Sequence, residues 1–289
     1  MTNEMNLLEE QDDIVGTEKS ESLGGTEGDD VIRGLAGNDT LTGSDGDDQL
    51  YGGLGRDRLH GNLGDDTLWG GSGDDELFGY YGRDVLYGQK GDDNIHGMSA
   101  DDTAYGGSGG DYFQGYSGAD LFYGNRDDDD LFGDTGDDTL FGGADNDQLV
   151  GGRGRDLQRG GSGEDRLAGE EGSDRLFGGL GNDYLNAGFG AKDQLTGGEG
   201  RDDFEVLHGR GWTPTIMDFA AEDSLTLGGL SEETEVTIEH RDGDSIVTLS
   251  GGSPAGDGDT VIVFHDVNFT GSIDPQEGLF TISGADLLG

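Results

Sequence analysis

One nine-residue pattern, Gly-x-x-Gly-x-Asp-x-Leu-x, repeats without a gap from Gly25 to Asn186. These 162 residues hold 18 copies, with Gly first and Asp sixth in every copy. The exceptions at the fourth position are Ala100, Asp127 and Asp145, and those at the large apolar eighth position are Ala104 and Gln158. A fixed period of this length is the signature of a solenoid, in which each repeat packs mainly on its neighbours.

Each repeat predicts a turn followed by a very short strand. Five or six residues rich in Gly, Asp and Asn favour a turn, and the next three, such as Thr40-Leu41-Thr42, alternate outside, inside and outside. Burying one Leu contributes roughly 1.5–3 kcal/mol, whereas ordering nine backbone residues costs about 9–18 kcal/mol. The turns offer carboxylate and carbonyl oxygens, so we expect bound calcium to supply the missing stabilisation.

The repeat quoted as Gly70-Gly71-Ser72-Gly73-Asp74-Asp75-Glu76-Leu77-Phe78 resembles the calcium-binding nonapeptide of RTX proteins. This resemblance implies an all-β fold, a right-handed parallel β-roll in which two repeats make one turn and calcium lies between turns on the same side. We expect a β-rich cap at the C-terminal end of the roll.

The resemblance assigns the side-chain calcium ligands to the sixth-position aspartates, with turn carbonyls completing each shell. These are Asp30, Asp39, Asp48, Asp57, Asp66, Asp75, Asp84, Asp93, Asp102, Asp111, Asp120, Asp129, Asp138, Asp147, Asp156, Asp165, Asp174 and Asp183, with Asp202 in a later copy. Weaker candidates, as ligands or as partners of ligands, stand in the fifth place at Asp29, Asn38, Asp47, Asp65 and Asp74. The alternative is that all of these side chains are solvated turn formers. In the copies without the fourth-position Gly, the turn geometry and the calcium occupancy stay open.

Composition agrees with a cation-dependent fold. A formal net charge of −47 with a mean hydropathy of −0.62 would ordinarily indicate disorder. About 16 calcium ions between repeats would offset about 32 of these charges. The acidity argues against binding nucleic acid, which requires a basic surface. The chain has no Cys, hence no disulfide framework, and no apolar run long enough to span a bilayer.

Three regions are expected: an N-terminal segment at 1–24, the roll at 25–205 and a β-rich cap at 206–289. Gly16 to Gly24 is a degenerate repeat with Glu21 and Leu23 in the sixth and eighth places, and it predicts an N-terminal cap, with Leu7 to Glu10 either a helical turn or unstructured. The phase slips by one residue between Ala187 and Thr196. Beyond it, the alternating runs 236–239 and 246–249 flank Arg241-Asp242-Gly243-Asp244, which predicts a hairpin.

The first ten residues have neither a basic start nor an apolar core, so no classical signal peptide is expected. The resemblance implies a secreted, extracellular protein whose C-terminal region is read by a type I secretion machinery. The end Ala285-Asp286-Leu287-Leu288-Gly289 matches the terminal signature of that route only in part.

A column of aromatic residues occupies the ninth position of alternate repeats. Its members are Tyr51, Trp69, Tyr87, Tyr105, Tyr123 and Phe141. With two repeats per turn they would stand about 4.8 Å apart, the spacing of paired strands. Two compatible interpretations stay open: the rings stabilise the sheet by stacking, or the strip binds a protein or a surface glycan.

No catalytic motif is visible, and we expect no enzyme. No His begins a His-Glu-x-x-His helix, and Gly106-Gly107-Ser108-Gly109-Gly110, which matches a hydrolase nucleophile pattern, lies in phase with the repeat. The favoured function is structural, adhesive or matrix-associated. The alternatives are a membrane-active, pore-forming protein and an accessory module of a polysaccharide-modifying enzyme.

Gln158 is the one polar residue at an inward eighth position, and Leu157 precedes it. Burying an unsatisfied amide costs on the order of 1–3 kcal/mol. The sequence therefore predicts either a strand shifted by one residue, which turns Leu157 inward, or a coil that opens early as calcium is lowered.

Overall fold

The computed structural model describes residues 13–190, 192–207, 213–220, 223–228, 235–241, 244–250, 260–264 and 280–283. Within these residues the fold is all-β, without a helix. The chain divides into two compact units, Met1–Asp130 and Leu131–Gly289, and each is described by itself. The expectations for Leu7 to Glu10 and for Ala285 to Gly289 lie outside the described residues.

Most strands of the roll are six residues long, not three as the sequence predicted. The strand Thr40–Asp45 contains the last three residues of one repeat and the first three of the next. The first-position Gly lies inside the strand, and the backbone bends only at the second position, where Leu35 has a φ of 80° and Gly53 a φ of 111°. The turn therefore shortens to the fourth, fifth and sixth residues, because Gly-rich sequence alone does not separate a turn from a tightly packed strand.

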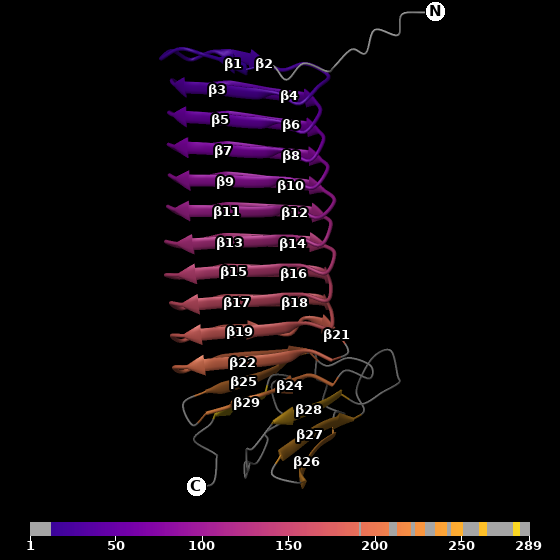
Figure 1. Cartoon of the computed structure of the whole chain (residues 1–289). Helices are drawn as coiled ribbons and strands as arrows, with labels where there is room; N and C mark the ends of the chain where they lie inside the picture. The colour runs from indigo at the N-terminus through magenta and orange to yellow at the C-terminus, as the bar shows by residue number, and fades with distance from the viewer. Residues whose placement is uncertain are drawn as a thin grey trace, which may run out of the picture. The chain divides into compact units, whose positions relative to one another are not determined.

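The first unit consists of two parallel sheets (Figure 1). One contains β1 (Asp13–Val15), β3 (Val31–Ala36), β5 (Gln49–Leu54), β7 (Thr67–Ser72), β9 (Val85–Lys90), β11 (Thr103–Ser108) and β13 (Leu121–Arg126), in that order. The other contains β2 (Ser22–Gly24), β4 (Thr40–Asp45), β6 (Arg58–Leu63), β8 (Glu76–Tyr81), β10 (Asn94–Ser99) and β12 (Tyr112–Ser117). β14 (Asp130–Thr135) begins at the last residue of this unit.

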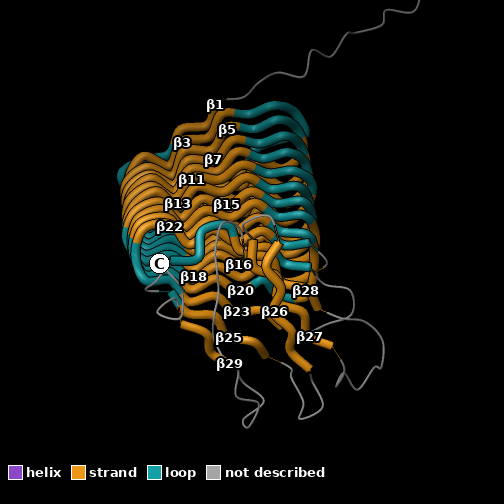
Figure 2. Tube along the Cα trace, turned by 90° about the horizontal axis from the view of Figure 1, so that it is seen from below, coloured by secondary structure: helices purple, strands orange, loops and turns teal. Residues whose placement is uncertain are grey.

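Paired strands are in register at a spacing of 18 residues. Ile32 lies beside Leu50, and Leu59 lies beside Leu77. Two repeats therefore make one turn of the roll, as the resemblance implied. Figure 2 shows the connecting turns gathered in columns beside the strands.

The second unit also contains two sheets. One has the order β15 (Thr139–Ala144), β17 (Leu157–Ser162), β19 (Arg175–Leu180), β22 (Gln194–Glu199), β24 (Thr215–Ile216), β28 (Thr260–Phe264), β27 (Asp244–Ser250), β26 (Glu235–Arg241). The other has β16 (Gln148–Gly154), β18 (Arg166–Gly172), β20 (Tyr184–Asn186), β23 (Asp203–Leu207), β25 (Ser224–Gly228), β29 (Phe280–Ser283), and β21 (Phe189–Gly190) pairs with β18.

The second unit changes from parallel to antiparallel pairing at its C-terminal end. β24 still pairs parallel with β28, whereas β28 with β27 and β25 with β29 are antiparallel. β26 and β27 pair antiparallel up to Arg241 and Asp244, which confirms the predicted hairpin. Phe219 covers the end of the core, with its ring centroid 5.8 Å from that of Phe204 and 5.3 Å from that of Phe264.

In the core of each unit, every repeat except that of Gln158 contributes one apolar side chain, and these side chains stack in a column along the roll. The first, sixth and eighth residues of each repeat point inward, and the eighth-position residues, such as Leu50, Leu68 and Phe113, are fully buried. Ala104 and Gln158 occupy the same buried position. Each coil therefore encloses two apolar side chains and two carboxylates.

The part of the chain that the structure describes contains no helix with the length and apolar character needed to cross a membrane.

Candidate calcium sites

The sixth-position aspartates are inside the roll. Every one from Asp30 to Asp183, together with Asp202, is at most 2% exposed. Two further carboxylates share this burial, Asp193 and Asp223. The sequence prediction did not include them, because Asp193 lies in the ten-residue slip and Asp223 lies beyond the last copy of the repeat. Both keep the local signal of an Asp two residues before a buried Leu, at Leu195 and Leu225.

One oxygen of each inner carboxylate bonds to the preceding coil. Oδ1 of Asp57 accepts the backbone N–H of Asp39 at 2.8 Å, and Oδ1 of Asp75 accepts that of Asp57 at 2.7 Å. The same bond continues in the second unit, where Asp174 Oδ1 accepts the N–H of Asp156 at 2.9 Å. The sixth-position residue has to be Asp or a close equivalent, because a shorter or apolar side chain would leave a buried N–H without an acceptor.

The second oxygen, Oδ2, is buried and has no hydrogen-bond partner in many of these residues. They are Asp39, Asp48, Asp57, Asp66, Asp75, Asp84, Asp93, Asp102, Asp111, Asp156, Asp174 and Asp183. A buried charged oxygen without a donor is costly, so native structures pair such groups or place a metal ion beside them. A calcium ion beside these buried Oδ2 atoms would supply the missing partner, so the aspartates fit a calcium site.

The first-position glycines bring a second kind of oxygen to the same place. A Cβ built on Gly34 would lie 2.6 Å from Asp39 Oδ2 and 2.6 Å from the carbonyl oxygen of Gly52 in the next coil. Any side chain here would fill the space between the carboxylate and that carbonyl. Gly is therefore required at the first position by close approach, not by a left-handed backbone.

Turn carbonyls are also directed from coil to coil. A Cβ built on the fourth-position Gly46 would lie 2.8 Å from the carbonyl oxygen of Gly28 in the preceding coil. Carboxylate and carbonyl oxygens are the ligands that calcium prefers, usually six to eight of them. Among the described residues no group of three or more carboxylate, imidazole or thiolate side chains could hold a metal. Calcium in this roll would therefore draw on main-chain oxygens in addition to the aspartates.

Burial raises the pKa of many inner carboxyls. The pKa rises to about 7 for Asp48, Asp66 and Asp75 and to about 8 for Asp102. Desolvation is the largest cause; the accepted backbone hydrogen bond acts in the opposite direction, and neighbouring carboxylates raise the pKa further. Without a cation these buried carboxyls therefore resist ionisation at neutral pH. A divalent ion beside them would lower their pKa and favour the ionised form.

The fifth-position side chains lie on the outside of the turns. Oδ1 of Asp29 accepts the N–H of Asp47, and Oδ1 of Asp47 accepts the N–H of Asp65, each at 2.8 Å. Asn38 does the same for Arg56 at 3.0 Å. These exposed residues form a hydrogen-bond ladder between turns, separate from the inner oxygens.

The three copies without a fourth-position Gly keep the common turn. Ala100, Asp127 and Asp145 have φ values of 80°, 70° and 76°, in the left-handed region that Gly occupies elsewhere. The turn geometry that the sequence left open at these copies thus keeps the positive φ of the other turns. Stacking on neighbouring coils fixes the backbone there, at an expected strain of about 1–2 kcal/mol for a residue with a Cβ.

The N-terminal turns satisfy their inner carboxylates locally. Glu21 takes the sixth position of the degenerate repeat, and its Oε2 accepts the N–H of Thr17 at 2.7 Å. Asp30 Oδ2 accepts the N–H of Thr26 at 2.6 Å. From Asp39 to Asp111 the corresponding oxygen has no such donor. The first turns therefore depend less on a cation than those that follow.

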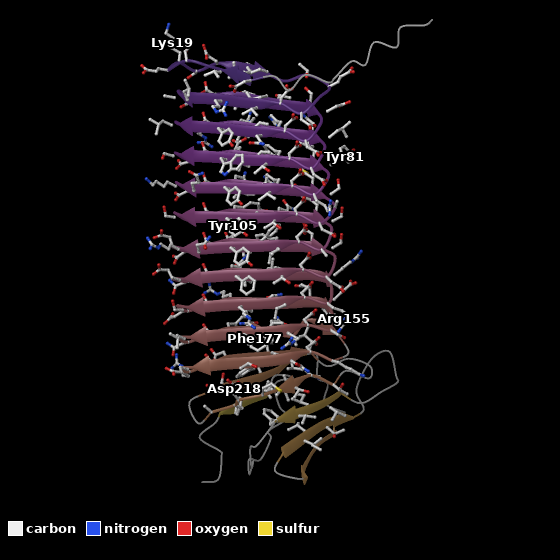
Figure 3. The ribbon with its side chains drawn as sticks, viewed as in Figure 1. Lys19, Tyr81, Tyr105, Arg155, Phe177 and Asp218 are labelled. Carbon is white, nitrogen blue, oxygen red and sulfur yellow. The ribbon has the colours of Figure 1, made fainter. Side chains whose placement is uncertain are left out.

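The aromatic column forms stacked rings on the outer face of the sheet that contains β5, β7, β9, β11 and β13, where Figure 3 labels Tyr105. In the first unit the ring centroids are 4.3 Å apart for Tyr51 and Trp69, 5.7 Å for Trp69 and Tyr87, 5.1 Å for Tyr87 and Tyr105, and 4.9 Å for Tyr105 and Tyr123. The interplanar angles are 8° or less. The ring faces thus contact one another, and their edges face outward.

Phe141, the sixth member of the column, belongs to the second unit. Its ring contacts Arg159, whose guanidinium carbon is 5.9 Å from the Phe141 centroid and 5.1 Å from that of Phe177. These are cation–π contacts. The structure shows stacking directly, and the binding role of the column stays a prediction.

Comparison with known families agrees with this geometry. The sequence model of the RTX calcium-binding nonapeptide repeat, four copies long, matches residues 24–59, 51–80, 60–95, 69–104, 78–113, 96–131, 105–140, 123–157 and 159–191. These matches cover more than half of the chain. No curated protein matches it. The repeat, the parallel roll and the family match together show that the chain belongs to the RTX calcium-binding nonapeptide repeat family.

Proposed function

We propose that this protein is secreted, folds when calcium binds outside the cell, and then serves as a rigid structural or adhesive element. The observation that supports this most strongly is the row of buried Oδ2 atoms without donors, represented by Asp57, Asp75 and Asp93. No side chain in the described roll neutralises these carboxylates. Calcium ions between coils would supply the missing positive charge and link each coil to the next.

The same dependence would regulate where the chain folds. Affinities in the range of extracellular calcium modules, about 10⁻⁴ to 10⁻³ M, leave such sites empty at cytosolic calcium and filled outside the cell. The net charge of −47 then keeps the calcium-free chain expanded by self-repulsion. An expanded chain suits export through a type I machinery, which the family membership supports, and calcium would trigger folding on exit.

The folded roll would act through its outer faces, and the proposal includes no catalytic step. The stacked part of the aromatic column in the first unit, from Tyr51 to Tyr123, is the surface we propose for a protein or glycan partner. Because the rings of Tyr87, Tyr105 and Tyr123 stack on one another, a partner would contact ring edges and phenol hydroxyls. This favours hydrogen-bonding partners over sugars that stack on a ring face.

A matched pair of neighbouring residues tests the calcium role. Asp75→Asn keeps an oxygen that can accept the Asp57 N–H but removes the buried charge, whereas Asp74→Asn changes an exposed fifth-position side chain. Calorimetric titration of the full chain should show that Asp75→Asn lowers the number of bound calcium ions or their affinity. Asp74→Asn should leave both nearly unchanged.

Circular dichroism provides the decisive control. The wild-type chain in calcium-free buffer at pH 7.5 should lack β structure and gain it on addition of calcium. Full β content without calcium, or equal calcium binding by Asp75→Asn and wild type, would contradict the proposal.

A further inference from the structure

Gln158 lies in the core in normal register. It pairs in β17 with Leu140 of β15 and Leu176 of β19, all at the eighth position, and it is 0% exposed. Leu157 keeps its outward place beside Arg175. The alternative in which the strand shifts to bury Leu157 is therefore wrong, and the roll buries a whole amide where its neighbours bury Leu.

Only one end of this amide has a partner. Nε2 donates to the carbonyl oxygen of Ala168 at 2.7 Å. Oε1 is buried without a hydrogen-bond donor. An unsatisfied buried oxygen lowers stability, and native cores seldom keep one without a compensating role.

The amide lies beside an inner carboxylate of the same repeat. A Cβ built on Gly151 would meet Asp156 Oδ2 and would lie 2.7 Å from Gln158 Nε2. Asp156 Oδ2 is itself buried without a partner. A half-turn about the last side-chain torsion exchanges the two amide atoms, which are nearly equal in size. It gives up the Nε2 bond to Ala168 and turns Oε1 toward that carbonyl oxygen, so this orientation is favourable only with a cation beside the two oxygens. The space beside Gly151 would then hold a carboxylate oxygen and an amide oxygen together.

The turn of this coil is unusually basic. Arg155 occupies the fifth position and Arg153 the third, and Arg153 lies 3.3 Å from Glu171 while Arg155 stays exposed. Two guanidinium groups near a cation site weaken calcium binding by repulsion. A site under this handicap gains from one more oxygen ligand, and amide carbonyls are ordinary calcium ligands.

We infer that Gln158 is a calcium ligand, with its Oε1 joining Asp156 Oδ2 on the ion held by this coil. The inference rests on the proposed calcium-dependent folding. It assigns a ligand at the eighth position of the repeat, which is otherwise reserved for core packing. It also means that the buried amide stabilises this coil when calcium is bound, whereas the sequence predicted a coil that opens early.

Two substitutions in the full chain separate these interpretations. Gln158→Leu fills the position with the residue of the neighbouring coils, and Gln158→Glu keeps an oxygen while adding charge. Hydrogen exchange during a calcium titration, read at residues 151–162, gives the calcium concentration at which this coil becomes protected. Residues 52–60 serve as an internal reference in the first unit.

If Gln158 is a ligand, Gln158→Leu raises the midpoint at residues 151–162 by about tenfold, the usual lower effect of losing a group that supports a metal. Gln158→Glu leaves it equal or lower. If Gln158 is only an unsatisfied core residue, Gln158→Leu lowers the calcium midpoint and Gln158→Glu raises it. Either this result or an unchanged midpoint for Gln158→Leu overturns the inference. The proposed function itself fails separately, if residues 52–60 of the wild type do not respond to calcium.

Discussion

Asp57 reaches back by one coil to hold Asp39: its Oδ1 accepts the Asp39 N–H at 2.8 Å, while its Oδ2 stays buried without a donor. One carboxylate therefore has two separate duties. The first is structural, because it satisfies a buried backbone donor. The second leaves an oxygen available to a cation between the coils. Since the pattern recurs from Asp39 to Asp111, we expect coil stacking and cation binding to be linked along these repeats.

Lowering the pH should partly replace calcium in stabilising the roll. Burial raises the pKa of Asp66 and Asp93 to about 7, against 3.8 in the unfolded chain. Between these values the folded state binds more protons, so its stability is present at low pH and is lost as pH rises through about 6 to 8. Circular dichroism in calcium-free buffer should show more β structure at pH 5 than at pH 8.

In saturating calcium the trend should invert, because protons then compete with the metal for the same oxygens. Equal β content at pH 5 and pH 8 without calcium would show that burial does not raise the pKa of the inner carboxylates.

Adding a methyl group at the first position should disrupt the roll. The Cβ in Gly34→Ala would lie 2.6 Å from both Asp39 Oδ2 and the Gly52 carbonyl. We expect a loss of at least about 2 kcal/mol in the free energy of unfolding, with weaker calcium binding. Gly24→Ala is the control, because a Cβ there meets nothing within 4 Å; its effect should stay within about 0.5 kcal/mol. Urea denaturation in saturating calcium would measure both, and equal effects would refute the close-approach argument.

Ala100→Gly should stabilise the protein. Ala100 has a φ of 80°, which strains a residue that carries a Cβ. Relief of about 1–2 kcal/mol is reduced by the greater freedom of Gly in the unfolded chain, so a net gain of about 0.5–1 kcal/mol is expected. The reverse change, Gly91→Ala, should destabilise, since Gly91 has a φ of 116° and its Cβ would strike the Gly73 carbonyl. Thermal unfolding in calcium would compare the two, and a lower Tm for Ala100→Gly would count against backbone strain.

Stacking in the aromatic column should be measurable at Tyr105. Its ring stacks on Tyr87 and Tyr123, and an aromatic pair contributes about 0.5–1.5 kcal/mol beyond burial. Tyr105→Ala should therefore lower the free energy of unfolding by at least about 1–3 kcal/mol. Tyr81, which is 62% exposed and lies at the turn edge in Figure 3, is the control, and Tyr81→Ala should change it by less than about 0.5 kcal/mol. Similar losses for the two variants would argue that the column does not stabilise the sheet and would strengthen its role in binding.

The inward position of the apolar residue was predictable from the sequence, because a period of nine with one Leu per repeat places Leu59 inside. The two repeats per turn were predicted from the resemblance to RTX proteins, and the register of Leu59 beside Leu77 confirms them. The burial of Asp57 was not predicted by spacing. The strand length was not predictable. Gly at the first position looks like a turn residue, and only the contact of Gly34 with the next coil shows that it belongs to the strand.

Other details depended on contacts between coils that no single repeat contains. Ala100 keeps a left-handed turn because its neighbours impose it. Asp47 holds the backbone of Asp65 instead of facing the inner oxygens. Asp218, which accepts the N–H groups of Gly197 and Gly198 at 2.9 Å each, gave no repeat signal at all.

The bond between consecutive inner aspartates has a direction, and this makes the two edges of a partly formed roll chemically different. Each coil donates its N–H to a carboxylate of the coil after it, as Asp39 does to Asp57. A partly formed roll therefore ends in an unbonded carboxylate oxygen at its N-terminal edge and in an unbonded N–H at its C-terminal edge. In the second unit the series ends at Asp223, whose Oδ1 accepts the Asp202 N–H and whose Oδ2 accepts the Ala220 N–H at 2.6 Å. Asp223 thus closes the series with both carboxylate oxygens bonded, and it supplies the acceptor that the Asp202 N–H would otherwise lack.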